Sequence, residues 1–131
     1  MNISEIAKRT GLSSKMIRDY EQSGLIASAP RNASGYRQYS EADLDTLYFI
    51  KHARDVDFSL VQIKTLLNLK HNPDRNSADV KQLVGEHIAM LQHKIERLQH
   101  MNATLQSWHD CCKGNEESDC PIIEGLSEQT R

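Results

Sequence analysis

The feature that most constrains this chain is a heptad pattern of apolar residues between Ser77 and about Trp108. The spacing alternates between four and three residues, at Val84, Ile88, Leu91, Ile95, Leu98 and Leu105. This pattern predicts one long helix with a narrow apolar stripe, which is buried when it packs against a partner helix. Asn102 interrupts the stripe, and a single buried Asn fixes the register or orientation of a coiled coil. We therefore expect residues 77–109 to be the dimerisation helix of a homodimer.

Length and composition favour a small helical protein. A chain of 131 residues suits one compact domain with an extended element, and 38% hydrophobic and 5% aromatic residues support only a modest core. No apolar run approaches the ~20 residues of a membrane span, and the first residues lack the features of a signal peptide. We expect a soluble, cytoplasmic protein with no membrane contact. No nucleophile–base arrangement or Gly-rich phosphate loop is present, so we expect no enzyme.

Charge is distributed unevenly, although the net charge is only −2. Residues 1–40 contain six Lys or Arg against three Asp or Glu, whereas residues 41–131 contain ten against fifteen. The N-terminal part is therefore the candidate surface for binding a polyanion.

The first 24 residues have the pattern of a helix-turn-helix. A first helix is predicted from a cap at Asn2 to a stop at Gly11, and a second over residues 14–22 after a cap at Ser13. In a helix-turn-helix the second helix enters the DNA major groove. Its outward-facing residues here are Ser14, Lys15 and Arg18. The same pattern also occurs in solvated helices of proteins that bind no nucleic acid.

A small hairpin is predicted after the second helix. Turn-forming residues run from Arg31 to Gly35, and apolar and polar residues then alternate as far as Tyr39. Arg31 and Arg37 stand beside Tyr36 and Tyr39, a mixture of groups that suits phosphate contact. The alternative is a surface hairpin that its tyrosines anchor to the core, and we expect Tyr39 to serve partly as such an anchor.

Two further helices complete the predicted N-terminal domain. Ser40 caps a helix that ends near Arg54, and Ser59 caps another that ends around Lys70. The predicted organisation is a mainly helical DNA-binding domain over 1–70, a polar linker over 71–76, the dimerisation helix over 77–109, and a loop with a C-terminal tail over 110–131.

All three cysteines lie between Cys111 and Cys120. Two thiolates, Cys112 and Cys120, satisfy a linear monovalent ion such as Cu(I), whereas structural zinc ordinarily takes four ligands. Zinc here would need His109, Asp119 or residues of another subunit. The spacing is not a strong zinc pattern, so incidental thiols remain the other interpretation.

Several N-terminal motifs resemble the winged-helix signature of MerR-family transcription regulators. They are ISEIAKRTGLS over 3–13, IRDYE over 17–21, GLI over 24–26, Arg31, and GYRQY over 35–39. The resemblance implies DNA contacts from the recognition helix through Lys15, Arg18 and Tyr20, from the wing through Arg31, Tyr36 and Arg37, and from Arg54. The family usually has an aromatic residue where this chain has Asp19, which either orients Arg18 or alters sequence preference.

The motif Cys-x7-Cys followed by Pro-Ile-Ile resembles the metal-binding loop of the copper-efflux branch of this family. That branch senses Cu(I) and also responds to Ag(I) and Au(I). The resemblance implies Cys112 and Cys120 as the metal ligands. It also implies that Ser77 of the partner subunit is a selectivity position, because divalent-ion sensors of the family carry a cysteine there. Cys111 departs from the pattern; we expect it to point away, with a spare ligand or an oxidisable thiol as alternatives.

The resemblance also implies a mechanism. A dimer binds a palindromic promoter whose spacer is too long, and the metal orders the cysteine loop, which packs residues 121–123 against the dimer. The DNA is then bent and untwisted, so RNA polymerase is a partner only through the DNA. The heptad residues favour parallel helices, whereas the family implies an antiparallel pair. The alternatives are a Zn(II), Hg(II) or redox sensor of this family, or a thiol metallochaperone that binds no DNA.

Overall fold

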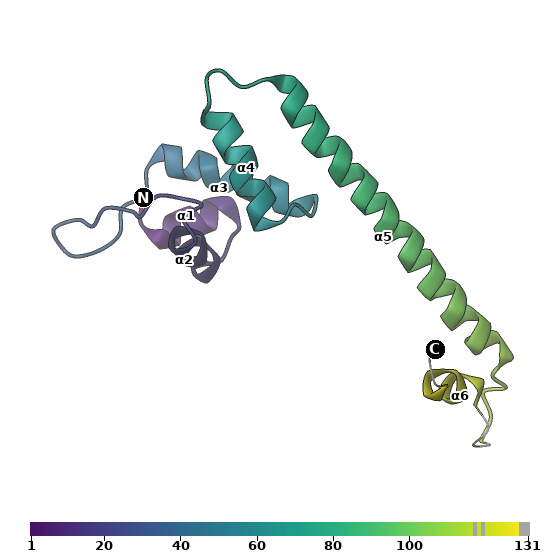
Figure 1. The fold of residues 1–131 in the computed structure, drawn as a ribbon. Helices are drawn as coiled ribbons and strands as arrows, with labels where there is room; N and C mark the ends of the chain where they lie inside the picture. Colours follow the sequence, from purple (N-terminus) through teal and green to yellow (C-terminus); the bar gives the residue numbers. More distant parts are fainter. Residues whose placement is uncertain (117, 119, 129–131) are drawn as a thin grey trace. The chain divides into compact units, whose positions relative to one another are not determined.

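The computed structural model describes residues 1–116, 118 and 120–128. These residues form six helices, α1 (Ile3–Thr10), α2 (Ser14–Gln22), α3 (Glu41–Asp55), α4 (Leu60–His71), α5 (Ser77–Cys111) and α6 (Pro121–Ser127) (Figure 1). The chain divides into two compact units, Met1–Val80 and Lys81–Arg131, with the division inside α5. The predicted mainly helical class, with a helix-turn-helix followed by one long helix, is confirmed.

Local side-chain caps begin the four N-terminal helices at the predicted places. The Asn2 side chain accepts a hydrogen bond from the Glu5 amide, and Ser13 does the same for Met16 at the start of α2. Complete capping boxes begin the next two helices, pairing Ser40 with Asp43 at α3 and Ser59 with Gln62 at α4. Because each cap satisfies amides that a helix leaves unpaired, these starts are encoded within four residues of sequence.

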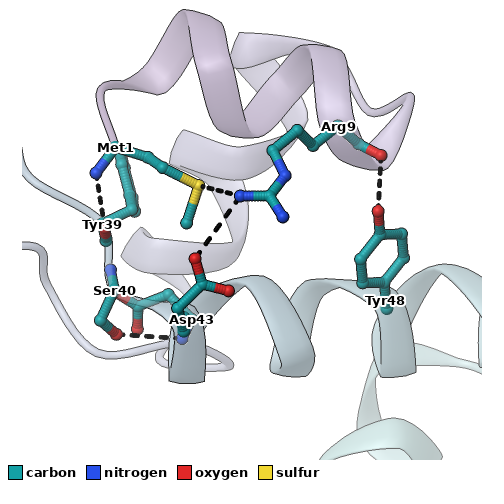
Figure 2. A network of polar contacts seen from close by, with 7 residues as sticks. Met1, Arg9, Tyr39, Ser40, Asp43 and Tyr48 are labelled. Carbon is teal, nitrogen blue, oxygen red and sulfur yellow. Dashed lines mark hydrogen bonds and ion pairs between the residues drawn. The ribbon is translucent and has the colours of Figure 1, made fainter.

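The turn of the helix-turn-helix is held by α3. Gly11 ends α1 with φ of 75°, a left-handed conformation that favours glycine. Tyr48 of α3 donates its hydroxyl to the Arg9 carbonyl at 2.7 Å (Figure 2), and Lys51 donates its ammonium to the Thr10 carbonyl at 2.8 Å. These donors satisfy carbonyls at the C-terminus of α1, where a cation is also favoured by the helix dipole. The orientation of α1 is thereby tied to α3.

The core of the first unit lies among α1 to α4. Its fully buried apolar side chains come from all four helices and are Ile6, Ile17, Leu47, Ile50 and Ile63. The apolar residues of α3 divide into two groups, since Leu44, Leu47 and Ile50 are buried while Tyr48 and Phe49 are half-buried. Helix α3 ends at Asp55 and α4 at His71, each one residue beyond the predicted end.

Helix α5 is 35 residues long and carries the predicted apolar stripe uncovered in the single chain. Leu91 is half-buried, whereas the other stripe residues are 38% to 62% exposed. The helix continues two residues past its predicted end, as far as Cys111. In the part of the chain that the structure describes, no helix combines the length and apolar content that crossing a membrane requires.

Helix α6 was not predicted from the sequence, which indicated only a loop with a C-terminal tail over 110–131. The helix runs from Pro121 to Ser127, and Figure 1 shows it beside the C-terminal end of α5. Proline suits the first helical position, but Gly125 in the interior lowers the helix propensity of the segment. Helix α6 packs against Trp108 of α5. Local helix propensities do not predict such a contact between residues far apart in the sequence.

Candidate nucleic-acid interface and metal site

Three of the predicted DNA-binding arginines meet around one hollow of the first unit. The hollow has a volume of about 360 Å³ and is lined by Arg18 of α2, by Arg31 and Arg37 of the α2–α3 segment, and by Asn2, Ile3, Gly35 and Tyr36. Tyr36 is 69% exposed at its edge. Guanidinium groups bind phosphate oxygens in a two-pronged geometry, and a phenol hydroxyl adds a donor. The arrangement therefore suits a phosphate of a nucleic-acid backbone.

The segment that carries Arg31 and Arg37 is a turn with one antiparallel bridge, between these two residues, and not a regular hairpin. The Asn32 side chain accepts hydrogen bonds from the amides of Ser34 and Tyr36, both at 3.0 Å. These amides are therefore not free to extend a strand ladder, which is why the predicted hairpin is reduced to one bridge. The Arg31 guanidinium donates to the Gly35 carbonyl at 2.8 Å, and this bond holds it across the turn.

A buried carboxylate holds Arg37. Glu21 of α2 has a side chain only 5% exposed, and its Oε2 lies 3.4 Å from Nη1 of Arg37. Its other oxygen accepts a hydrogen bond from the Ala29 amide at 3.4 Å. Burial, reinforced by the neighbouring Glu21 carboxylate and opposed by Arg37, raises the pKa of the Tyr39 hydroxyl to about 12. Tyr39 is thus the expected core anchor, 3% exposed, beside the Glu21–Arg37 pair.

Sequence reasoning missed Glu21, although a signal was present. Glu21 is four residues after Ile17 and adjacent to Tyr20, so it lies on the inner face of α2 that these residues mark. A charged residue on a buried face needs a partner, and the basic residues of the following segment were the candidates.

The outer face of α2 presents the remaining recognition-helix residues. Ser14 is half-buried at the first position, while Lys15 and Arg18 are exposed. Lys15 Nζ lies 3.3 Å from the Asp19 carboxylate, one helical turn away. The structure therefore pairs Asp19 with Lys15 and not with Arg18, because residues four apart share a helix face while sequence neighbours do not.

Tyr20 and Arg54 lie apart from the arginine hollow. Tyr20 is 6% exposed and packs in the core, with an edge toward a second hollow of about 270 Å³ that Arg54 also lines. The Arg54 guanidinium donates to the Phe58 carbonyl at 2.8 Å. Both residues therefore help to shape the fold around α2 and the α3–α4 turn, and the predicted direct DNA contact of Tyr20 is limited to its exposed edge.

The two predicted metal ligands come together at the end of α5. Cys112 is the first residue after this helix, and its amide donates to the carbonyls of Trp108 and His109, both at 3.2 Å. Cys120 is the N-cap of α6. Hydrogen bonds from the Ile123 amide, then the Ile122 amide and the Cys112 thiol, lower the pKa of Cys120, against the opposing effects of burial and Glu124. The pair can therefore supply a thiolate to a soft metal ion.

The other candidate ligands are placed differently. Cys111 is exposed at the last position of α5, and all three thiols are free. The Nδ1 atom of His109 lies 3.3 Å from the Asp110 carboxylate. Asp119 lies outside the described residues, and within the described ones no group of three or more His, Cys, Asp or Glu is arranged to hold a metal. Ser77 is exposed at the first position of α5, in the first unit.

Two family models together match residues 1–108 of the chain. The model described as "MerR HTH family regulatory protein" matches residues 1–70, and the model described as "MerR, DNA binding" matches residues 44–108. The chain belongs to the MerR family. It is therefore a DNA-binding regulatory protein, and the expectation that it is not an enzyme is confirmed by the family.

Similar proteins of this family span the full chain. The "Probable heavy metal-dependent transcriptional regulator" of Haemophilus influenzae is 55% identical over 127 residues, which cover 97% of this chain and 99% of that protein. The "HTH-type transcriptional regulator CueR" of Escherichia coli O157:H7 is 45% identical over 127 residues, with 97% and 94% covered. The structure of PbrR691 from Ralstonia metallidurans CH34, determined in complex with lead(II), superposes with a TM-score of 0.82 at 31% identity, covering 97% and 99%.

Proposed function

We propose that this MerR-family protein is a heavy-metal-dependent activator that senses Cu(I), and also Ag(I) and Au(I), and controls genes for copper efflux or resistance. The observation that carries the choice of ion is the placement of two thiols, Cys112 directly after α5 and Cys120 directly before α6, where α6 lies against Trp108 of α5. The printed names of the Haemophilus and Escherichia relatives support the regulatory part of the proposal.

The DNA-binding role is assigned to residues 1–70. Arg18, Arg31 and Arg37 form a cationic hollow with Tyr36 at its edge, and such a hollow fits a backbone phosphate. Ser14 and Lys15 stand at the first turn of α2, the part of a recognition helix that reaches base edges in the major groove. Tyr20 and Arg54 line a separate hollow beside Asp19 of α2, where Arg54 is the further candidate for a phosphate contact.

Dimerisation is assigned to α5, over 77–109, after a linker at 71–76. Its apolar stripe is exposed in the single chain, and an exposed stripe of this length is stabilised when a second copy covers it. In a homodimer two recognition helices face a two-fold-symmetric DNA site. RNA polymerase is then affected indirectly, through the shape of promoter DNA that the dimer distorts.

Metal sensing is assigned to residues 110–131. Two soft thiolates match Cu(I) in preferred ligand type and number, whereas a divalent ion needs further ligands. The first residue of α5 is Ser77, and a serine hydroxyl is not a thiolate donor. The partner subunit's Ser77 therefore adds no third thiolate when it approaches the loop. The ion acts as a switch only if it binds the activating state of the dimer more tightly than the repressing one.

Competition titration of the reduced protein against a Cu(I) chelator, without oxygen, tests the proposal. We expect Cu(I) to bind at one ion per chain and both Cys112→Ser and Cys120→Ser to lose tight binding. Cys111→Ser is the matched control and is expected to keep it. Tight Zn(II) binding without Cu(I) binding would overturn the choice of ion in favour of a divalent sensor, for which the lead(II) complex of PbrR691 is a precedent.

A further inference from the structure

Helix α6 touches α5 through a glycine that has no room for a side chain. A Cβ atom built at Gly125 would lie 2.5 Å from Cε2 of Trp108, 2.7 Å from Cζ2 and 2.7 Å from Nε1. Real Cβ atoms do not approach other atoms so closely, so the flat indole ring lies directly on the backbone of α6. Glycine in a helix interior is normally destabilising relative to alanine, and close approach of another group is a physical reason for its presence.

The exposed apolar residues of α6 do not supply this contact. Ile123 is 62% exposed and Leu126 is 66% exposed, whereas Gly125 and Trp108 are half-buried. Pro121 and Ile122 at the start of α6 are half-buried as well, so the Trp108–Gly125 contact is the attachment of its C-terminal half to α5 in the described part of the second unit.

The two members of this contact flank the two thiols in the sequence. Trp108 is one helical turn before Cys112, whose amide is bonded to the Trp108 carbonyl at 3.2 Å. On the other side Cys120 directly precedes α6, and its carbonyl accepts a hydrogen bond from the Glu124 amide, next to Gly125, at 3.0 Å. One turn of helix thus connects each member of the contact to one cysteine. Fixing Trp108 against Gly125 also restricts the separation of the two sulfurs.

We propose that Trp108 and Gly125 are positioning residues, which hold Cys112 and Cys120 at the spacing of a two-thiolate site before the metal ion binds. This inference rests on the proposed Cu(I)-sensing function. Without the contact, α6 would be joined to α5 only through the seven residues between the two cysteines, and the ion would itself have to meet the entropic cost of bringing the two sulfurs together. With the contact in place, part of this cost is met before the ion binds, and affinity for the ion is higher.

The first measurement needs no metal. Trp108 is the only tryptophan of the chain, so its fluorescence reports the contact directly. In the reduced, metal-free protein we expect Gly125→Ala and the bulkier Gly125→Val to move the emission to longer wavelength, because the ring becomes more exposed to water. Gly85→Ala is the matched control, since Gly85 is a helical glycine of α5 with open space around its Cβ position, and it is expected to leave the emission unchanged.

The second measurement gives the effective concentration of the two thiols. In a Cys111→Ser background, the full-length protein is equilibrated with oxidised dithiothreitol, which takes up two electrons and two protons and is reduced to its dithiol as Cys112 and Cys120 form a disulfide. We expect Gly125→Ala and Trp108→Ala each to lower the equilibrium constant, and the affinity for Cu(I), by about tenfold. Trp108→Phe keeps a flat ring and is expected to retain most of the wild-type equilibrium constant and Cu(I) affinity.

A double variant separates positioning from general damage. If the two residues act through one contact, Trp108→Ala combined with Gly125→Ala loses about as much as either alone, not the product of the two losses. Additive losses, an equal loss in Gly85→Ala, or an unchanged thiol equilibrium in Gly125→Val would overturn the inference. If the thiol equilibrium responds as expected but the wild-type protein does not bind Cu(I), the proposed function fails and the role of the contact stands.

Discussion

The two units of this chain differ in how their functional groups are held. In Met1–Val80 the arginines of the hollow are attached to a core of fully buried residues, and the buried Glu21 carboxylate pairs with Arg37. In the described part of Lys81–Arg131 no apolar side chain reaches the same degree of burial, and the cysteines depend on helix ends and on the Trp108–Gly125 contact. Elements that respond to ligands are drawn from the less stable parts of proteins. The comparison predicts a rigid first unit and a second unit whose cysteine-bearing end rearranges more easily.

Removing one leucine side chain from each unit, buried in the first and exposed in the second, gives the largest expected difference. Leu47 is 0% exposed in α3, so Leu47→Ala is expected to lower the free energy of unfolding by about 2–5 kcal/mol, through lost burial and a cavity. Leu126 is 66% exposed in α6, and Leu126→Ala is expected to change it by less than about 0.5 kcal/mol. Urea unfolding followed by circular dichroism measures both. Equal losses would contradict the contrast between the two units.

Alkaline pH tests the buried cluster of Glu21, Arg37 and Tyr39. The pKa of Tyr39 is about 12 in the folded protein, whereas an unfolded tyrosine has the ordinary pKa of 10. The contribution of the protonated Tyr39 to the free energy of unfolding is therefore complete below pH 10 and decreases as the pH rises toward 12. The free energy of unfolding is expected to fall by up to about 2.5 kcal/mol over this interval.

Tyr39→Phe is expected to remove this alkaline loss, which urea unfolding at a series of pH values measures. Tyr36→Phe is the matched control, since its ring is 69% exposed, and it should retain the loss. An alkaline loss that persists in Tyr39→Phe would show that another group causes it.

Removing one arginine from each unit gives the smallest expected free-energy change. It distinguishes the loss of a local DNA contact from a general loss of positive charge. Arg18 lines the cationic hollow, so Arg18→Ala is expected to weaken binding to a two-fold-symmetric promoter fragment by roughly tenfold. The slope of log affinity against log salt concentration is expected to become shallower by about one. Arg97→Ala in α5 removes the same charge from the second unit and is expected to change little. Fluorescence anisotropy at several salt concentrations measures both, and equal effects would argue against a localised DNA surface.

Much of the fold could be predicted because its determinants lie close together in the sequence. The caps at Asn2, Ser13, Ser40 and Ser59 each act on an amide three residues away, and the heptad stripe of α5 repeats within one helix. The eight predicted DNA-binding residues also fall on one unit, because the helix-turn-helix and its following segment are adjacent in the chain. Which of them contact DNA stays a prediction.

The remaining features were decided by tertiary structure. Glu21 pairs with Arg37 across 16 positions, and Trp108 lies against Gly125 across 17, distances over which no local periodicity carries information. The α2–α3 segment formed a tight turn where a hairpin was expected, because the Asn32 side chain took up the amides of a strand. By itself the sequence determined helices α1 to α5 and the order of the candidate ligands, since these depend on neighbouring residues. Only packing decided which distant side chains meet, because burial and close approach are properties of the folded chain.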